Sequence, residues 1–307
     1  MVAPRADFAL ARLTTIGTGG PAEFFARAGS GGELDELLGW ARERGLELSV
    51  VGSGSNLLVA DDGVRGLVVK LDRDLARIVP VEGGLEVGGG ARLPAVAAAS
   101  ATLGMSGIEF GVNIPGTFGG AVRMNANAYD GALGRVVEWV EVHTAGGVSR
   151  RSPAELDFAY RSSNLQPGEV VGRGRLRLEP APTGEVKARL EEMRARRHEA
   201  QPKGIRTFGS TFKNPTGETA GLLLARAGAG GLTVGGARFS PKHSNFVENT
   251  GGASTAEVVA LMDAGRRLVA ERFAIELEPE VQTLGRVEFP WAVGRRGSGG
   301  SVEDQER

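Results

Sequence analysis

The stretch VVGSGSNLL at residues 50–58 carries much of the information about the fold of this chain. β-Branched residues precede its glycines and a second apolar run follows them, so the sequence predicts a loop between two strands. Consecutive N–H groups in such a loop can converge on phosphate oxygens, and serine and asparagine side chains add donors. No Gly-Lys-Ser/Thr follows and no helix opens here, which excludes a Walker A loop and a G-x-G-x-x-G turn. We therefore expect a dinucleotide scaffold of another kind.

A second glycine-rich segment, NIPGTFGG, occupies residues 113–120. Its Pro-Gly turn and paired glycines lead into AVRMNA, where a flat ring or a ribityl chain can lie against the backbone. One such loop alone is explained as an ordinary turn, since the chain has 48 glycines. Two loops together suggest one extended cofactor. The predicted cofactor-binding residues are Val51, Gly52, Ser53, Gly54, Ser55, Asn56, Ile114, Pro115, Gly116, Thr117, Gly119 and Gly120.

Six motifs, in this order along the chain, resemble those of the UDP-N-acetylenolpyruvoylglucosamine reductase family, the flavoenzymes of peptidoglycan precursor synthesis. Besides the two loops, they are TTIGTGGPA at 14–22, YRSS at 160–163, GSTFKNP at 209–215 and LEPEV at 277–281. The resemblance covers roughly residues 14 to 284. It implies an enzyme with FAD as cofactor and NADPH as the hydride-donating co-substrate. The implied reaction is the reduction of UDP-N-acetylglucosamine enolpyruvate, a UDP-sugar, to UDP-N-acetylmuramate.

The resemblance also implies an α+β fold, in which a vanillyl-alcohol-oxidase/PCMH-type FAD-binding domain is joined to a smaller α+β substrate-binding domain. We expect an N-terminal arm at 1–18, the FAD-binding domain at 19–182, the substrate-binding domain at 183–290 and a disordered tail at 291–307. The last strand of the substrate-binding domain should return to the active site.

Apolar spacing predicts helices at 33–44, 93–103, 183–200, 217–227 and 255–273. Ser152 and the proline after it have the form of a capped helix start. We interpret Arg194, Arg196, Arg197 and His198, near the end of the third helix, as a solvated face rather than a binding patch.

Reduction of an enolpyruvyl ether needs a hydride at the β-carbon, a proton at the α-carbon, and stabilisation of charge on the carboxylate. The resemblance assigns the hydride to flavin N5 and the proton to Ser210. It assigns support of the carboxylate and of the developing charge to Arg161 and Glu280. A serine hydroxyl can protonate an enolate when nearby cations, here Lys213 and Arg161, stabilise the alkoxide.

Each of these residues also has a simpler interpretation. Ser210 could be a turn hydroxyl after a glycine, and Arg161 could belong to a surface ion pair. Glu280 could be an exposed carboxylate at a strand edge, and Glu278 competes with it for the functional role. A diphosphate substrate needs cationic and amide donors. The candidates for substrate contacts are Tyr160, Lys213, Asn214, Lys242, His243 and Asn245. Packing alone would equally explain His243, and half-burial would explain Tyr160.

Composition limits the function further. With 307 residues, of which 41% are hydrophobic, the chain can bury a substantial core, and its net charge of −1 gives no field for nucleic acid or anionic lipid. The absence of cysteine excludes disulfides and iron–sulfur clusters, and the three histidines are scattered, so we expect no metal. No histidine lies beside the loops, which predicts non-covalent FAD. The N-terminus has no apolar segment, so we expect a cytoplasmic protein without membrane insertion, and we favour a monomer.

The interval between Arg161 and Ser210 is short, and one strand and one helix take up most of it. The inserted element whose tyrosine closes over the substrate in long-form members is therefore missing, which implies a shorter subclass. Two other functions stay open. An oxidase on the same FAD scaffold would not need Ser210, and a flavin- or nucleotide-sugar-binding regulator would keep the fold without turnover.

Overall fold

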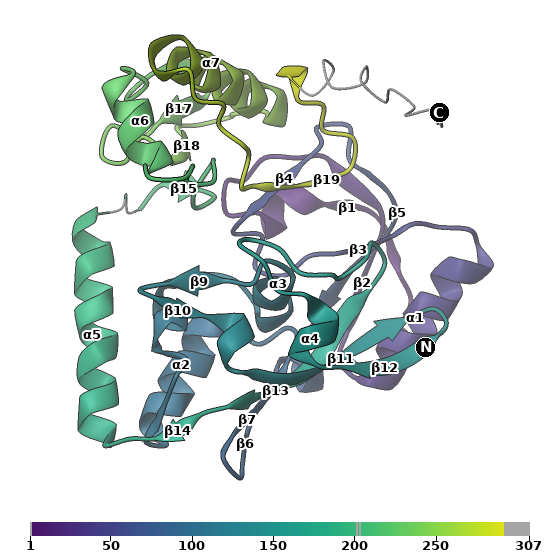
Figure 1. The fold of residues 1–307 in the computed structure, drawn as a ribbon. Helices are drawn as coiled ribbons and strands as arrows, with labels where there is room; N and C mark the ends of the chain where they lie inside the picture. Colours follow the sequence, from purple (N-terminus) through teal and green to yellow (C-terminus); the bar gives the residue numbers. More distant parts are fainter. Residues whose placement is uncertain (1, 201, 203, 292–307) are drawn as a thin grey trace, which may run out of the picture.

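The computed structural model describes residues 2–200, 202 and 204–291. In Figure 1 the purple-to-teal residues before helix α5 (Thr183–Ala200) form the lower part of the molecule, and the green-to-yellow residues after it form the upper part. The expected tail at 291–307 lies, apart from its first residue, outside the described residues. The chain has the predicted α+β fold, with helices and strands mixed in both parts.

The first sheet of the lower part contains, in spatial order, β1 (Arg5–Ala9), β2 (Pro21–Ala28), β5 (Val64–Leu71) and β3 (Leu48–Val50). β1 is antiparallel to β2, whereas β5 is parallel to both β2 and β3. Helix α1 (Gly31–Glu43), predicted at 33–44, packs its apolar stripe against this sheet. It begins slightly earlier than expected, because Ser30 caps it by accepting the N–H of Glu33. The first glycine loop follows β3 directly.

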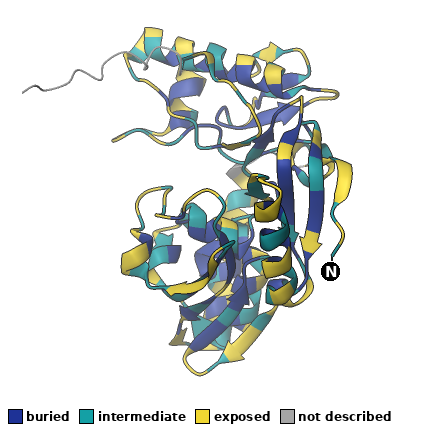
Figure 2. Ribbon diagram, turned by 90° about the vertical axis from the view of Figure 1, so that its right-hand side faces the viewer, coloured by how far each residue is buried: buried dark blue, intermediate teal, exposed yellow. Residues whose placement is uncertain are grey.

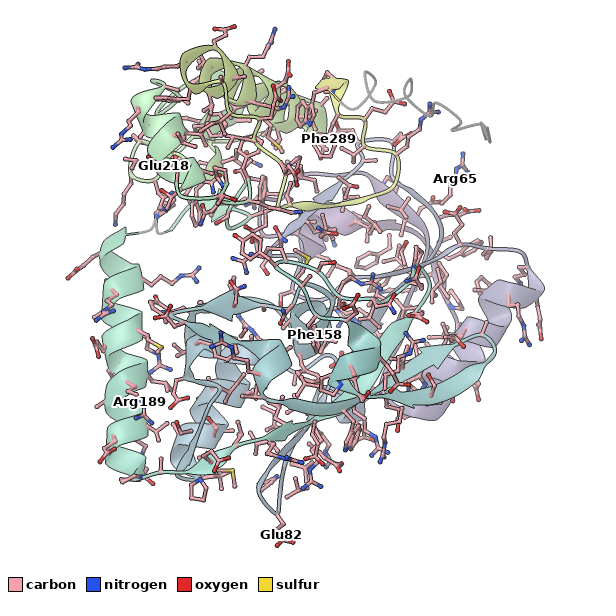
Figure 3. All side chains as sticks on the ribbon, viewed as in Figure 1. Arg65, Glu82, Phe158, Arg189, Glu218 and Phe289 are labelled. Atoms are coloured by element: carbon pink, nitrogen blue, oxygen red, sulfur yellow. The ribbon has the colours of Figure 1, made fainter. Side chains whose placement is uncertain are left out.

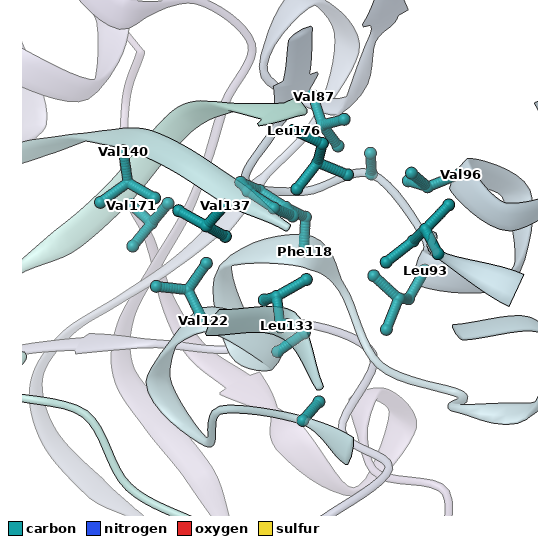
Figure 4. Packing of buried hydrophobic residues seen from close by; sticks show 14 of the residues in the cluster. Val87, Leu93, Val96, Phe118, Val122, Leu133, Val137, Val140, Val171 and Leu176 are labelled. Carbon is teal, nitrogen blue, oxygen red and sulfur yellow. The ribbon is translucent and has the colours of Figure 1, made fainter. Parts of the chain in front are cut away.

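The second sheet contains, in spatial order, β12 (Gly147–Arg151), β11 (Val137–Thr144), β13 (Val170–Arg177), β7 (Gly84–Gly88) and β6 (Ile78–Val81). Its neighbouring strands pair antiparallel. Helices α2 (Leu93–Thr102) and α3 (Phe118–Arg123) contribute to the core on this sheet. Phe118 lies in the middle of that core, among valines and leucines (Figure 4). Because Phe118 is fully buried, it anchors the second glycine loop, of which it is a part.

Short elements connect these sheets. They are η1 (Leu10–Leu13), η2 (Arg73–Ala76), η3 (Glu109–Asn113), η4 (Leu133–Arg135), α4 (Pro153–Leu156), β4 (Leu57–Val59), β8 (Met105–Ser106), β9 (Asn127–Ala128), β10 (Gly131–Ala132) and β14 (Glu179–Pro180). β9 pairs with β10, and β8 pairs with β14. The predicted helix start after Ser152 is confirmed, since Ser152 and Glu155 form a capping box on α4.

The upper part is built on a sheet that contains, in order, β15 (Arg206–Thr207), β18 (Val247–Asn249), β17 (Ala237–Phe239) and β16 (Thr233–Val234). Helices α6 (Ala220–Arg226) and α7 (Thr255–Phe273) share an apolar core with this sheet. The bounds of α7 match the sequence prediction, because a capping box at Ser254 starts it and an apolar face runs along it. Helix α6 begins later than predicted, because Thr219 is its N-cap.

Several contacts join the upper part to the lower part. Strand β19 (Gln282–Leu284) returns from the upper part and pairs in parallel with β4, and Figure 1 shows the two strands side by side. Ile16 and Leu58 of the lower part are buried in the core of the upper part. The carboxylate of Asp61 accepts hydrogen bonds from the N–H groups of Thr255 and Ala256, at 2.8 and 2.9 Å. The start of α7 is therefore completed by the other part of the molecule.

Helix α5 packs on the lower part. Its Val186 and Leu190 are buried against α2 and the end of η3. Arg189, labelled in Figure 3, donates hydrogen bonds to Glu109 and Ser106. The domain boundary expected at residue 183 stays a prediction, and α5, which begins there, packs on the lower part.

Burial follows the layers of the fold. Buried residues, dark blue in Figure 2, lie along the interior strands, whereas exposed residues, yellow, lie mainly on outer helix faces and loop tips. Within the part of the chain that the structure describes, no helix is long and apolar enough to span a membrane.

Candidate active site

The two glycine loops predicted from the sequence lie against each other. A Cβ atom on Gly52 would lie 2.5 Å from Oγ1 of Thr117, so only glycine fits at this meeting point. Gly52 follows β3 of the first sheet, and Thr117 precedes α3 on the second sheet. The loops therefore form one continuous surface where the two sheets meet.

A cleft of about 330 Å³ runs along this surface. Both loops line it, and so do Arg161, Ser210 and Glu280, the residues that the resemblance assigns to catalysis. A narrower cavity of about 100 Å³ shares residues of both loops with the cleft and extends toward β13. The two cavities form one groove, and the catalytic candidates lie along its wider section.

The first loop presents unpaired donors. Within the described ranges, no residue accepts a hydrogen bond from the backbone N–H groups of residues 52–56 or from the hydroxyls of Ser53 and Ser55. Lys70 holds the loop in place, because its ammonium group donates to the carbonyl oxygen of Gly52. Burial lowers the pKa of Lys70. Free N–H groups in a glycine loop are suited to a pyrophosphate.

Two residues of this loop are also engaged within the protein. Gly54 has a φ of +62°, and a Cβ atom on it would collide with the carbonyl oxygen of Leu13, so packing against the N-terminal segment requires glycine here. The amide of Asn56 donates to the carbonyl oxygen of Glu280 at 3.2 Å, and the Asn56 carbonyl accepts the N–H of Gln282 at 3.1 Å. Both contacts fix the loop against neighbouring segments.

In the second loop, two glycines leave space. A Cβ atom on Gly120 would meet nothing closer than Thr117 Oγ1 at 3.5 Å, and one on Gly116 nothing closer than Ile114 Cγ2 at 4.0 Å. Gly119 differs, because its N–H donates to the carbonyl oxygen of Gly89 at 2.8 Å. The surface at Gly116 and Gly120 can therefore receive a flat group, whereas Gly119 packs closely against the backbone of Gly89.

Arg161 and Glu280 form an ion pair in the cleft. Nε of Arg161 lies 2.9 Å from Oε1 of Glu280, and 20% and 12% of the two side chains are exposed. The Nε–H is not aligned for a hydrogen bond, so the contact is mainly electrostatic. A second nitrogen, Nη1, donates to the carbonyl oxygen of Asn127 at 3.3 Å. Arg161 has a φ of +57°, an uncommon conformation for a residue other than glycine that is found at functional sites.

Burial raises the pKa of Glu280 above its ordinary value, and the positive charges of Arg161 and Lys213 oppose that rise. The competing candidate, Glu278, is exposed, and its carboxylate lies 3.4 Å from Nζ of Lys213. Among the described residues that line the cleft, Glu280 is present and Glu278 is not. The geometry thus favours Glu280 over Glu278.

Ser210 is half-buried and lines the same cleft as this ion pair. A turn hydroxyl would be bonded to a nearby backbone group. In the described parts of the chain, however, the Ser210 hydroxyl has no hydrogen-bond partner. It is therefore free to contact a ligand.

Comparisons with known proteins agree with this geometry. A model of the FAD binding domain matches residues 22–151, and a model of the UDP-N-acetylenolpyruvoylglucosamine reductase C-terminal domain matches residues 201–284. The chain is 44% identical to the UDP-N-acetylenolpyruvoylglucosamine reductase of Anaeromyxobacter dehalogenans (strain 2CP-C), over 92% of this chain and 86% of the relative. The chain belongs to the UDP-N-acetylenolpyruvoylglucosamine reductase family.

Two further members of this family are similar over nearly their whole length. The enzyme of Gloeobacter violaceus is 43% identical, with 90% of this chain and 95% of the relative covered. The crystal structure of UDP-N-acetylenolpyruvylglucosamine reductase (MurB) from Thermus caldophilus superposes with a TM-score of 0.80 at 36% identity, covering 92% of this chain and 99% of that chain. The fold is therefore a PCMH-type FAD-binding domain joined to the C-terminal domain of this reductase family.

None of the six residues predicted to contact substrate is among the described residues that line the cleft. Asn245 is buried, and its amide bonds the backbone N–H and C=O of Phe212, both at 2.9 Å. Asn214 accepts the N–H of Ala220 at 3.1 Å, at the start of α6. Both asparagines hold backbone of the upper part, a use that the sequence pattern did not reveal.

The remaining four lie outside the cleft. Nζ of Lys242 lies 3.4 Å from the carbonyl oxygen of His198. Burial lowers the pKa of His243, which packs edge-on against Phe246 at 4.8 Å between ring centroids. Lys213 contacts Glu278, and Tyr160 is 49% exposed with the guanidinium of Arg161 over its ring at 5.5 Å. Packing thus accounts for His243, while Tyr160 remains accessible.

Arg197 lines the cleft and was assigned to a solvated face in the sequence. That interpretation fits Arg194 and Arg196, which pair with Glu191 and Glu192 on the surface. It does not fit Arg197, because no residue in the described ranges pairs with its guanidinium and burial lowers its pKa.

A sequence signal for Arg197 exists. It continues, at helical spacing, the inward stripe of Val186, Leu190 and Met193 on α5. The narrow cavity contains further unpredicted residues. They are Val50, Leu71, Gly89, Gly90, Arg123, Leu165, Glu169, Val170 and Val171. Arg123 donates to the carbonyl oxygens of Leu165, Gln166 and Glu169 and so fixes the loop that covers this cavity.

Proposed function

We propose that this protein catalyses the NADPH-dependent reduction of UDP-N-acetylglucosamine enolpyruvate to UDP-N-acetylmuramate in the cytoplasm, as a monomer with non-covalent FAD. The convergence of Arg161, Ser210 and Glu280 in one cleft carries the proposal, because these residues come from distant parts of the chain and the same cleft is lined by both glycine loops. Membership of the reductase family supports the same reaction.

The groove fits FAD by the chemistry of its residues. The free N–H groups of residues 52–56 would hold the pyrophosphate, and the open surface at Gly116 and Gly120 would lie against a flat ring. No histidine of the described residues lines either cavity and the chain has no cysteine, which favours non-covalent binding. When bound, FAD would supply the hydride from N5 to the β-carbon of the substrate.

The chain's own residues would control the charge and the proton. The Ser210 hydroxyl would donate a proton to the α-carbon of the enolpyruvyl group. Arg161 would bind the substrate carboxylate and stabilise the negative charge that develops there, and Glu280 would hold the guanidinium in place through the 2.9 Å contact. The positive charges of Arg161 and Lys213 would stabilise the alkoxide that forms when Ser210 gives up its proton.

Arg197 would bind the diphosphate of the nucleotide sugar. It is an unpaired cation in the cleft, and a guanidinium matches the geometry of phosphate oxygens. Between Arg161 and Ser210 the structure contains β13, β14, α5 and β15, with no further helix or strand in the described residues of that interval. A cation on α5 is therefore well placed to serve a shorter subclass that lacks a closing tyrosine element.

Anaerobic spectroscopy tests the proposal. The purified protein should be yellow, and acid precipitation should leave the flavin in solution. NADPH should bleach the flavin, and the enolpyruvyl sugar nucleotide should then restore its colour. Rapid restoration by oxygen but not by the sugar nucleotide would indicate an oxidase on the same scaffold. Failure of NADPH to bleach the flavin would indicate a flavin-binding protein without this activity.

A further inference from the structure

Asn245 holds the segment that follows Ser210. Its Oδ1 accepts the N–H of Phe212 and its Nδ2 donates to the Phe212 carbonyl oxygen, both at 2.9 Å. Its own carbonyl oxygen accepts the N–H of Thr211 at 2.8 Å. Asn245 is 2% exposed and Phe212 is fully buried, so water cannot replace these bonds. Loss of the amide would leave both backbone groups of Phe212 buried and unpaired.

The other side of this segment is bonded to the residues around Glu280. The Glu280 N–H donates to the carbonyl oxygen of Thr211, and the Lys213 N–H donates to that of Glu278, each at 2.9 Å. Phe212 and Pro279 form an isolated antiparallel bridge. The segment therefore has a backbone neighbour on one side, and on the other side the Asn245 amide takes the place of a second neighbouring strand.

The position of Ser210 follows from this arrangement. Its hydroxyl has no partner of its own among the described residues, so the backbone of Thr211 and Phe212 sets where it lies relative to Glu280. A misplacement of about 1 Å can slow a reaction by about 10²-fold. We propose, on the basis of the function proposed above, that Asn245 is a positioning residue for proton transfer from Ser210. It contacts neither substrate nor cofactor and acts by keeping Ser210 in register with Glu280.

Two leucine variants separate positioning from general stability. Asn245→Leu keeps the same branched arrangement of four side-chain heavy atoms and removes the donor and the acceptor. Asn249→Leu is the matched control, because Asn249 is also buried, at 7% exposure, in the same part of the molecule. Its amide donates to Ile16 and accepts from Gly251 and Ala253, so its bonds do not reach the Ser210 segment.

Both half-reactions of the holoenzyme are measured anaerobically in each variant. In Asn245→Leu, flavin bleaching by NADPH should stay within about threefold of wild type, while reoxidation by the enolpyruvyl sugar nucleotide slows by about 10²-fold. Its solvent deuterium isotope effect should rise, because proton transfer becomes limiting. Amide hydrogen exchange should accelerate at Phe212. In Asn249→Leu both half-reactions and the exchange at Phe212 should match wild type, whatever the change in melting temperature.

Other results would overturn the inference. Reoxidation at the wild-type rate in folded Asn245→Leu would do so, and so would equal slowing in Asn249→Leu. If Asn245→Leu does not fold, Asn245→Asp replaces it, since that variant keeps the acceptor for the Phe212 N–H and loses the donor. Asn245→Asp should show the same selective slowing of reoxidation to a smaller extent. Reoxidation at the wild-type rate in this variant would overturn the inference. If wild-type flavin is not reoxidised by the sugar nucleotide, the proposed function fails, whereas exchange at Phe212 still tests whether Asn245 holds the segment.

Discussion

Nε of Arg161 lies 2.9 Å from Oε1 of Glu280, although Arg161 follows α4 in the lower part and Glu280 precedes β19. Such a partly buried pair is sensitive to the loss of either member, because the remaining charge is left without compensation. The pair also joins the two parts of the molecule at the cleft. Protonation of Glu280 should therefore change both the stability of the protein and its activity.

The pH dependence of stability should report on Glu280. Because burial raises its pKa, folded protein binds this proton more tightly than unfolded protein, whose carboxyl has the ordinary value of 4.5. Its contribution to stability is thus present below pH 4.5 and is lost as pH rises through the folded pKa. The free energy of unfolding of wild type minus that of Glu280→Gln should fall as pH rises across this window. Urea unfolding at a series of pH values measures it, and a difference that rises with pH would contradict the burial argument.

Replacement of Ser210 by alanine should separate the two half-reactions. NADPH bleaches the flavin without a proton from Ser210, so this step should stay near normal in Ser210→Ala. Reoxidation by the enolpyruvyl sugar nucleotide should slow by about 10²–10⁴-fold, the usual effect of a lost general acid. Ser162→Ala, at an exposed serine beside Arg161, is the control. Equal slowing of both half-reactions, or of neither, would rule out Ser210 as the proton donor.

A larger side chain at Gly120 should exclude the flavin. The structure leaves room for a Cβ atom there, but a leucine would extend into the space over the second loop. Gly120→Leu should therefore fold and lose most of its FAD, as measured by the absorbance ratio at 450 and about 280 nm. Gly39→Leu is the control, since Gly39 lies in α1, away from the cleft, with nothing near its Cβ position. Full flavin occupancy in Gly120→Leu would show that the cofactor does not lie on this surface.

Neighbouring arginines on α5 should differ in their effect on substrate binding. Arg197→Gln should raise KM for the nucleotide sugar about tenfold or more, with kcat little changed, because a charge-assisted contact to the diphosphate is lost. Arg196→Gln should leave KM near normal, since Arg196 pairs with Glu192 on the surface. Steady-state kinetics of the two variants decides the matter. Equal KM values in the two variants would show that Arg197 belongs to the solvated face, as the sequence predicted.

The carboxylate of Asp61 should stabilise the whole molecule. Asp61→Ala leaves the N–H groups of Thr255 and Ala256 without their acceptor, and loss of such a cap costs about 1–2 kcal/mol. Urea unfolding should show this loss, whereas Asp62→Ala, at the exposed neighbour, should change stability by less than about 0.5 kcal/mol. No difference between the two would mean that solvent replaces the cap.

The sequence predicted those features whose physical cause is local. The bounds of α7 followed from an apolar period and from a capping residue at its start, and both are local to the helix. The glycine loops were recognisable because their backbone chemistry depends on consecutive residues. The order of six motifs along the chain, rather than any single motif, pointed to Arg161, Ser210 and Glu280. The fold brings these residues into one cleft.

Residues whose partners lie far away in the chain were harder to interpret. The amide of Asn245 bonds Phe212, which is 33 residues away, so nothing beside Asn245 indicates that its polar atoms are already engaged. Arg197 and Arg196 are adjacent and chemically alike, and in the sequence only the helical spacing of Arg197 from Leu190 and Met193 distinguishes them. Gly54 lines the cleft as predicted for a residue of this loop, but its packing against the N-terminal segment cannot be foreseen from the loop itself.

The pairing of β19 with β4 has a consequence for biosynthesis. The glycine loop at residues 52–56 is synthesised well before its support from Glu280, Gln282 and β19, since Glu280 follows Asn56 by 224 residues. A nascent chain that ends before these residues would carry the loop without its final neighbours. Stable binding of the cofactor should therefore follow the synthesis of β19, which completes a binding site begun more than two hundred residues earlier.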